Sequence, residues 1–341
     1  MLFLRFFKIF FTKFLPYMSS THLIEKEILN VVEMPIESIK KISKNQILIA
    51  HRNKAVCLYQ LSENPTSGPS ICLKAYKHKS LVSDVCYADA GEKILSVSNQ
   101  SLCVFDKDTK EASEFKGHKL PIVSVAINKD NNKIVTGSQD GTFVVWNTNG
   151  EQKEKLGSGE FGHSGWINIV EFVPESAETL ATASEDGSVK IWNLETNELL
   201  KTFIDGHYVN VEKLAEQKQK VKANTELAVK AMCFSNDGSL MAYGGRNGKV
   251  YIINLSNNEA LQIFDVPDRI TALASGETQP MIAVAIPNKI LLWNIIENEI
   301  VAEYALNTKN EVYCYSMVFS GDELIVGFTN GKVLRLEIMR K

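Results

Sequence analysis

The chain has 341 residues, of which 45% are hydrophobic and 23% are charged, and its formal net charge is −3. This composition is that of a folded protein with a sizeable core, and it excludes both an intrinsically disordered chain and a general polyanion binder. Any contact with nucleic acid must therefore come from a local cationic patch. The six cysteines show neither a C-x-x-C pair nor metal-ligand spacing, and we expect buried free thiols at Cys57, Cys72, Cys86, Cys103, Cys233 and Cys314.

The N-terminal stretch MLFLRFFKIFFTKFLPY (1–17) contains six phenylalanines and three cations but no acid. It is too short and too charged for a membrane span, and it lacks the small-residue cleavage site of a signal peptide. We expect residues 1–17 to be an extension outside the fold, followed by a single domain over residues 18–341. An amphipathic anchor at a membrane surface is the alternative for this segment.

A repeated pattern of strands runs through the rest of the chain. Each repeat is a β-rich run that ends in a large apolar residue, and these closing residues are Tyr59, Phe105, Trp146, Trp192, Ile253, Trp293 and Leu336. The steps between them are 46, 41, 46, 61, 40 and 43 residues, and Gly-His pairs stand at 117–118, 162–163 and 206–207. A period of about 40–45 residues with these signatures is typical of the WD-repeat propeller, in which each repeat is a four-stranded blade. The pattern predicts an all-β fold, a seven-bladed WD-repeat β-propeller.

Two segments at the ends of the chain suit closure of such a ring. The run THLIEKEIL (21–29) is a strand left over at the start, and KVLRLEI (332–338) ends the last repeat without a fourth strand. We expect the N-terminal strand to complete the last blade, which removes the open sheet edges. The 61-residue step contains an insertion at 208–228 with alternating charges, which we expect to be a solvated helix or loop above the propeller.

Histidine, serine, aspartate and tryptophan recur at matching places in the third and fourth repeats. The two sets are His118, Ser138, Asp140 and Trp146, and His163, Ser184, Asp186 and Trp192. These residue types could form a catalytic or metal site. In a propeller blade, however, the Gly-His histidine is expected to meet the turn aspartate, and the serine and the Trp N–H to extend the hydrogen-bond chain into the core.

Enzyme activity is not expected from the sequence. It contains no nucleophile motif, P-loop, dinucleotide-binding glycine motif or zinc helix. An enzyme of propeller fold would also need polar ligands that converge on the central channel, and inner-strand runs such as IVSVAIN (122–128) offer almost none. We therefore predict a non-catalytic protein without a cofactor or a metal site.

The order of the irregular motifs resembles that of the receptor for activated C kinase family, the WD-repeat proteins of the eukaryotic small ribosomal subunit. The motifs that carry the resemblance are LVSDV (81–85), WNTNGEQK (146–153), GHSGWINIVEFVPES (162–176), VKIWNLE (189–195), GGRNGKVYIINL (244–255) and the run from ITALA (270–274) to AIPNKILLWNI (285–295). The resemblance extends from about Thr21 to Arg340 and is strongest in blades three to six.

The resemblance implies a scaffold on the head of the small (40S) subunit that regulates translation. Its expected partners are rRNA, neighbouring head proteins, protein kinases such as protein kinase C, and translation factors. The expected location is cytoplasmic and ribosome-associated, without a membrane span. The connection at 303–316 looks shorter than the protruding loop of the family, which leaves partner specificity there open. The alternative is a signalling or ubiquitin-ligase adaptor that does not bind the ribosome.

A cation pair in the turn of the first blade, in the pattern Arg-Asp-Lys, belongs to the rRNA contact of that family. Here the turn is Arg52-Asn53-Lys54. Between Ser38 and Ser80 eight cations stand against one acid, a concentration that suits a phosphate backbone, although a solvated basic surface is the alternative. The predicted rRNA-binding residues are Arg52, Lys54, Lys40, Lys41, Lys74, Lys77 and Lys79.

Overall fold

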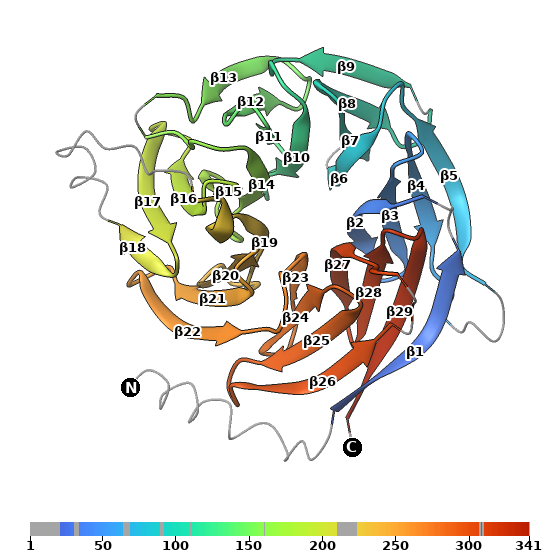
Figure 1. The fold of residues 1–341 in the computed structure, drawn as a ribbon. Helices are drawn as coiled ribbons and strands as arrows, with labels where there is room; N and C mark the ends of the chain where they lie inside the picture. The colour runs from blue at the N-terminus through green and yellow to red at the C-terminus, as the bar shows by residue number, and fades with distance from the viewer. Residues whose placement is uncertain are drawn as a thin grey trace.

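Seven antiparallel β-sheets are arranged as the blades of a ring (Figure 1), which confirms the predicted seven-bladed propeller. The computed structural model describes residues 21–340 apart from 31–33, 64–68, 89–91, 110, 160, 210–223, 307 and 309. The predicted extension at 1–17 lies outside the described residues. In the described part of the chain, no helix is long and apolar enough to cross a membrane.

Blades one to three each have four strands, and the first strand of each blade lies nearest the centre of the ring. Blade one contains β2 (Ile36–Ser43), β3 (Gln46–His51), β4 (Ala55–Gln60) and β5 (Ile71–Lys77). Blade two contains β6 (Val82–Ala88), β7 (Lys93–Ser98), β8 (Ser101–Asp106) and β9 (Ala112–Lys116). Blade three contains β10 (Ile122–Ile127), β11 (Lys133–Ser138), β12 (Phe143–Asn147) and β13 (Gln152–Leu156).

Blade four has five strands, and the later blades have four. Blade four contains β14 (Ile167–Phe172), β15 (Thr179–Ser184), β16 (Ser188–Asn193), β17 (Glu198–Ile204) and β18 (His207–Val209). Blade five follows the short 3-10 helix η1 (Thr225–Leu227) and contains β19 (Val229–Phe234), β20 (Leu240–Gly245), β21 (Lys249–Asn254) and β22 (Glu259–Asp265). Blade six contains β23 (Ala272–Ser275), β24 (Met281–Ile286), β25 (Lys289–Asn294) and β26 (Glu299–Ala305).

Blade seven is built from both ends of the chain. It contains β27 (Cys314–Ser320), β28 (Glu323–Phe328) and β29 (Lys332–Arg340), and its outer strand is β1 (Thr21–Asn30). β1 pairs with β29 in antiparallel register, with Thr21 opposite Arg340 and Asn30 opposite Lys332. The prediction that the N-terminal strand completes the last blade is therefore confirmed.

The core of the molecule lies between the blades. In the described residues the buried apolar side chains form seven clusters, each shared by two neighbouring blades. The middle strands are consequently buried on both faces, which explains their continuous apolar runs. Neighbouring blades approach so closely that a Cβ on Gly137 of β11 would lie 2.6 Å from the side chain of Val170 in the next blade.

The insertion at 208–228 begins differently from the expected helix or loop. Asp205 and Gly206 both have positive φ, 49° and 80°, and they form the tight turn of a hairpin that adds β18 to the outer edge of blade four. Gly206-His207 is thus part of this hairpin, and His207 is exposed. Residues 210–223 lie outside the described residues.

Candidate nucleic-acid interface

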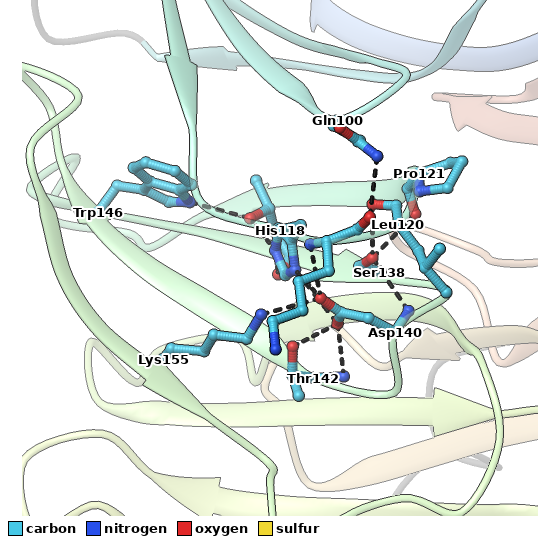
Figure 2. A network of polar contacts seen from close by, with 11 residues as sticks. Gln100, His118, Leu120, Pro121, Ser138, Asp140, Thr142, Trp146 and Lys155 are labelled. Atoms are coloured by element: carbon cyan, nitrogen blue, oxygen red, sulfur yellow. Dashed lines mark hydrogen bonds and ion pairs between the residues drawn. The ribbon is translucent and has the colours of Figure 1, made fainter.

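The histidine, aspartate and tryptophan of blade three belong to one connected hydrogen-bond network (Figure 2). His118 Nδ1 lies 3.3 Å from Asp140 Oδ2, and His118 Nε2 lies 2.9 Å from Thr136 Oγ1. Trp146 Nε1 donates to the same Thr136 Oγ1 at 2.9 Å. Thr136 therefore links the histidine to the closing tryptophan.

Blade four repeats this arrangement. His163 Nδ1 lies 3.1 Å from Asp186 Oδ2, and its Nε2 lies 2.7 Å from Thr182 Oγ1. Trp192 Nε1 donates to Thr182 Oγ1 at 2.9 Å. The two networks occupy the same positions of successive blades, as expected for a repeated structural element.

The serines do not occupy the place that the sequence analysis predicted. Ser138 Oγ donates to the carbonyls of Leu120 and Pro121 and accepts from the N–H of Asp140, which shapes the turn. Ser184 Oγ likewise accepts from the N–H of Asp186 at 3.1 Å. The linking hydroxyls are Thr136 and Thr182. The sequence carried a signal for them, because each threonine precedes the closing tryptophan by the same interval in both repeats.

Electrostatics keeps these groups in fixed protonation states. Burial lowers the pKa of His118 and of His163, and the facing aspartates only partly oppose this, so both rings are neutral near pH 7. Burial alone would raise the pKa of Asp140. The hydroxyl of Thr142 and the ammonium of Lys155, 2.9 Å away, outweigh burial and hold the pKa well below its usual range. Satisfied groups of this kind stabilise a blade.

Two other blades contain variants of this network: blade two keeps a histidine but pairs it with a serine, and blade five uses a tyrosine. In blade two, His78 Nε2 lies 3.2 Å from Ser96 Oγ, and its ring packs edge-on against Phe105. In blade five, Tyr251 donates to Asp205, and Asn247 Nδ2 donates to Tyr251 Oη at 2.7 Å. A tyrosine network therefore replaces a histidine network in blade five.

The central channel is more polar than the sequence analysis predicted. It is a cavity of about 910 Å³, and Lys40, Asp84 and Glu171 are among the residues that line it. Burial raises the pKa of Glu171 to about 7, while Lys40 acts in the opposite direction. Burial alone would lower the pKa of Lys40, but Asp84 and Glu171 outweigh it, so the pKa is raised. Within the described residues, no three His, Cys, Asp or Glu side chains come together to hold a metal ion.

The turn at residues 52–54 presents two cations at one end of blade one. Arg52 is half exposed and forms an ion pair with Glu37 (Nε to Oε1, 2.8 Å), and Lys54 is exposed. Burial raises the pKa of Glu37 above its ordinary value, although the guanidinium of Arg52 acts in the opposite direction. Lys54 has φ 69°, in the left-handed region.

Two further cations lie at the same end. Lys77 is the register partner of Ala55, next to the turn, and the N–H of His78 donates to the carbonyl of Lys54 at 2.8 Å. Lys79 follows directly and is 89% exposed, with its Nζ 2.8 Å from Glu114 Oε2. We call Arg52, Lys54, Lys77 and Lys79 the turn-end patch. Lys119 directly follows His118 in blade three, just as Lys79 directly follows His78 in blade two. Lys119 was not among the predicted rRNA-binding residues.

The remaining three predicted cations lie elsewhere, so the expectation of one cationic edge was wrong. Lys40 lines the channel, and Lys41 pairs with Glu277 of blade six near the opposite end of β2. Lys74 reaches the β8–β9 connection of blade two, where its Nζ lies 3.0 Å from Asp108 Oδ1. The physical reason is the hairpin: Ile36 pairs with His51 and Ser43 with Gln46, so residues 40–44 and 52–54 lie toward opposite ends of one sheet.

Comparison with known proteins agrees with this geometry. A family model described as "WD domain, G-beta repeat" matches residues 109–147 and 156–193, and one described as "Anaphase-promoting complex subunit 4 WD40 domain" matches residues 205–278. The "Guanine nucleotide-binding protein subunit beta-like protein" of Encephalitozoon cuniculi (strain GB-M1) is 34% identical over 332 residues, which is 95% of this chain and 99% of that protein.

Two further relatives are similar at lower identity or coverage. The "Small ribosomal subunit protein RACK1y" of Oryza sativa subsp. japonica is 30% identical over 200 residues, 55% of this chain and 53% of that protein. The "MST50-interacting protein 11" of Pyricularia oryzae is 28% identical over 312 residues, 87% of this chain and 91% of that protein.

The seven blades and their internal histidine networks define a WD-repeat β-propeller, a class of scaffold that is generally non-catalytic. Within this class, the near-complete overlap with the Encephalitozoon protein is decisive. The chain belongs to the family of RACK1-like WD-repeat proteins, the receptor for activated C kinase family.

Proposed function

We propose that this scaffold binds the rRNA of the small ribosomal subunit head through the turn-end patch. The observation that carries the proposal is the backbone of Lys54. Its φ of 69° lies in the left-handed region, which Gly141 (φ 77°) and Gly187 (φ 86°) adopt at the same turn position in blades three and four. The left-handed backbone conformation costs a non-glycine residue about 1 kcal/mol or more. Lys54 therefore places a cation at a turn position where glycine would be unstrained.

The chemistry of the patch suits a phosphate backbone. Arg52 and Lys54 are exposed, and the cations of the two ion pairs, Arg52 and Lys79, have side chains that are 51% and 89% exposed, so an RNA phosphate can reach them. Contacts of this kind position a protein on RNA and do not read its sequence. The name of the rice relative, a small ribosomal subunit protein, supports this assignment. Neighbouring head proteins, protein kinase C and other kinases, and translation factors are the proposed protein partners, at a cytoplasmic, ribosome-associated location.

Sedimentation of a charge-reversed protein tests the proposal. The double variant Arg52→Asp with Lys54→Glu should stay folded and leave the small-subunit fractions of a sucrose gradient at physiological salt. The matched control is Arg246→Asp with Lys249→Glu, because blade five has the same Arg-Asn turn with Arg246 about half exposed (49%). The control should co-sediment like the unaltered protein. Continued co-sedimentation of the first variant overturns the proposal.

A second candidate function is an adaptor that acts away from the ribosome in signalling or in ubiquitin-ligase assembly. It is favoured by the Pyricularia relative, which is named for an interaction with another protein and matches 87% of this chain. Mass spectrometry of small subunits washed at low salt separates the two candidates. Absence of the native protein from those subunits supports the adaptor, and stoichiometric presence supports the ribosomal scaffold.

A further inference from the structure

Two thiols lie side by side in the outer half of blade one. Cys72 of β5 is exposed, and Cys57 of β4 is 7% exposed. In the strand register, Cys72 of β5 lies opposite Tyr59 of β4, and Tyr59 shares its face of the sheet with Cys57, two residues earlier. The pairing of the two strands is irregular between Leu58 and Tyr59. The Cys72 side chain is close enough to the Cys57 thiol to contribute to its raised pKa. An exposed thiol and a buried thiol therefore occupy diagonal positions on one face of two neighbouring strands.

A buried imidazole stands on the inner side of this pair. His51 Nε2 lies 3.1 Å from Cys57 Sγ, and His51 is only 2% exposed. Burial lowers the pKa of His51, although the side chain of Asn53 acts in the opposite direction, so the ring is neutral near pH 7. Burial raises the pKa of Cys57 to about 12, with a further contribution from Cys72. Cys57 is therefore a protonated thiol that needs a base before it can react.

We propose that Cys72, Cys57 and His51 form an oxidation site, in which a peroxide oxidises Cys72 and Cys57 then closes a disulfide with it. In the first step the Cys72 thiolate attacks the peroxide, the O–O bond breaks, and Cys72 becomes a sulfenic acid while the peroxide is reduced to water or an alcohol. In the second step the Cys57 sulfur attacks the Cys72 sulfur, and its proton passes to His51 Nε2 as the S–S bond forms. The S–O bond breaks, and hydroxide leaves and takes the proton from His51 as water.

The remaining cysteines do not share these features. Cys86, Cys103, Cys233 and Cys314 are buried free thiols, so they serve as internal controls in one and the same sample. Burial raises the pKa of Cys103 to about 11 and that of Cys314 to about 12. Only Cys72 in the described part of the chain combines exposure with a neighbouring thiol.

The sequence allows a direct measurement on the full chain. No Lys or Arg occurs between Ala55 and Leu73, so trypsin releases both cysteines in the single peptide 55–74. After treatment with hydrogen peroxide and alkylation, this peptide should lose both alkylation sites together and be lighter by two hydrogen atoms. Cleavage after Glu63 should give two fragments that stay joined until a reductant is added. Alkylation of the other four cysteines should not change.

Three variants assign the roles. Cys57→Ser should trap Cys72 as a sulfenic acid that reacts with dimedone, and Cys72→Ser should leave Cys57 reduced. His51→Gln should slow closure of the disulfide without slowing oxidation of Cys72. Three outcomes for the unaltered protein overturn the proposal: Cys72 no more oxidised than Cys86, Cys72 carried to sulfinic acid while Cys57 stays open to alkylation, or Cys72 joined to a second copy of the chain.

Discussion

Arg335 Nη1 lies 2.6 Å from Glu27 Oε2 across 308 residues of sequence, and this ion pair joins the last strand of the chain to the first. The same guanidinium donates to Glu323 Oε2 at 2.8 Å and to the carbonyl of Ser62 at 2.7 Å. Arg335 is 3% exposed, so these charges are paired away from water. The closure of the ring therefore contains an ionic lock in addition to the backbone ladder of β1 and β29.

Replacing Arg335 by methionine should destabilise the protein strongly. The substitution leaves the buried carboxylate of Glu27 without its cation, while Glu323 keeps only its ion pair with Lys26, and breaking a buried pair in this way costs about 3–5 kcal/mol. Urea unfolding measures the loss. The control is Lys289→Met, which removes an ion pair between partly exposed residues, Lys289 and Glu303, and should cost about 1 kcal/mol or less. Equal effects of the two substitutions would contradict the ionic lock.

Loss of the Thr182 hydroxyl should disrupt the network of blade four. Thr182→Val keeps the shape of the side chain but leaves Trp192 Nε1 without its acceptor and His163 Nε2 without its partner. We expect a loss of about 2–3 kcal/mol, because buried polar groups are left unsatisfied. Thr182→Ser retains the hydroxyl and should cost less. If Ser184→Ala destabilised the protein more than Thr182→Val in thermal unfolding, the serine would be the link after all.

Acidification should destabilise the protein through its buried histidines. The pKa values of His118 and His163 are lowered from 6.5 in the folded state, so the unfolded chain binds more protons. The stability that their neutral rings contribute is present above pH 6.5 and is lost as the pH falls toward the folded pKa values. The slope is at most about 1.4 kcal/mol per pH unit for each histidine. Urea unfolding between pH 7 and pH 5 should show a shallower slope for His118→Gln with His163→Gln; an unchanged slope would refute this origin.

Lys54→Gly should separate stability from RNA binding. Glycine adopts φ 69° without strain, so the free energy of unfolding should rise by about 1 kcal/mol. The loss of one phosphate contact should at the same time weaken rRNA binding and reduce its salt dependence by nearly one unit of slope. Binding to a small-subunit rRNA fragment at several salt concentrations checks the second part. A variant that is more stable and binds rRNA as tightly as the unaltered protein would contradict the proposed phosphate contact of Lys54.

The fold was open to prediction because it depends on repeated local signals. Closing residues such as Trp146 and Trp192 mark each blade, and the unpaired run at 21–29 had only one place in a closed ring. The hydroxyl link was missed because serine and threonine both occur in each repeat, and only the register of the strands decides which one faces the histidine.

The cationic surface was harder to predict from the sequence. Lys40 and Lys54 are close in sequence, but one lines the channel and the other sits at a turn, because a hairpin carries neighbouring residues to opposite ends of a sheet. A count of charges along the sequence does not take this reversal of chain direction into account. The buried lock of Arg335 was missed for a related reason, since its partner Glu27 stands 308 residues away.

The pairing of β1 with β29 also sets an order of events during synthesis. β1 leaves the ribosome first, but its partner strand is the last element of the propeller to be made. Until then the nascent chain holds an unpaired strand of ten residues, a form that invites pairing with other chains. Every newly made copy must therefore wait for its final strand before the ring can form, and chaperones that shield strand edges are expected to act in this interval.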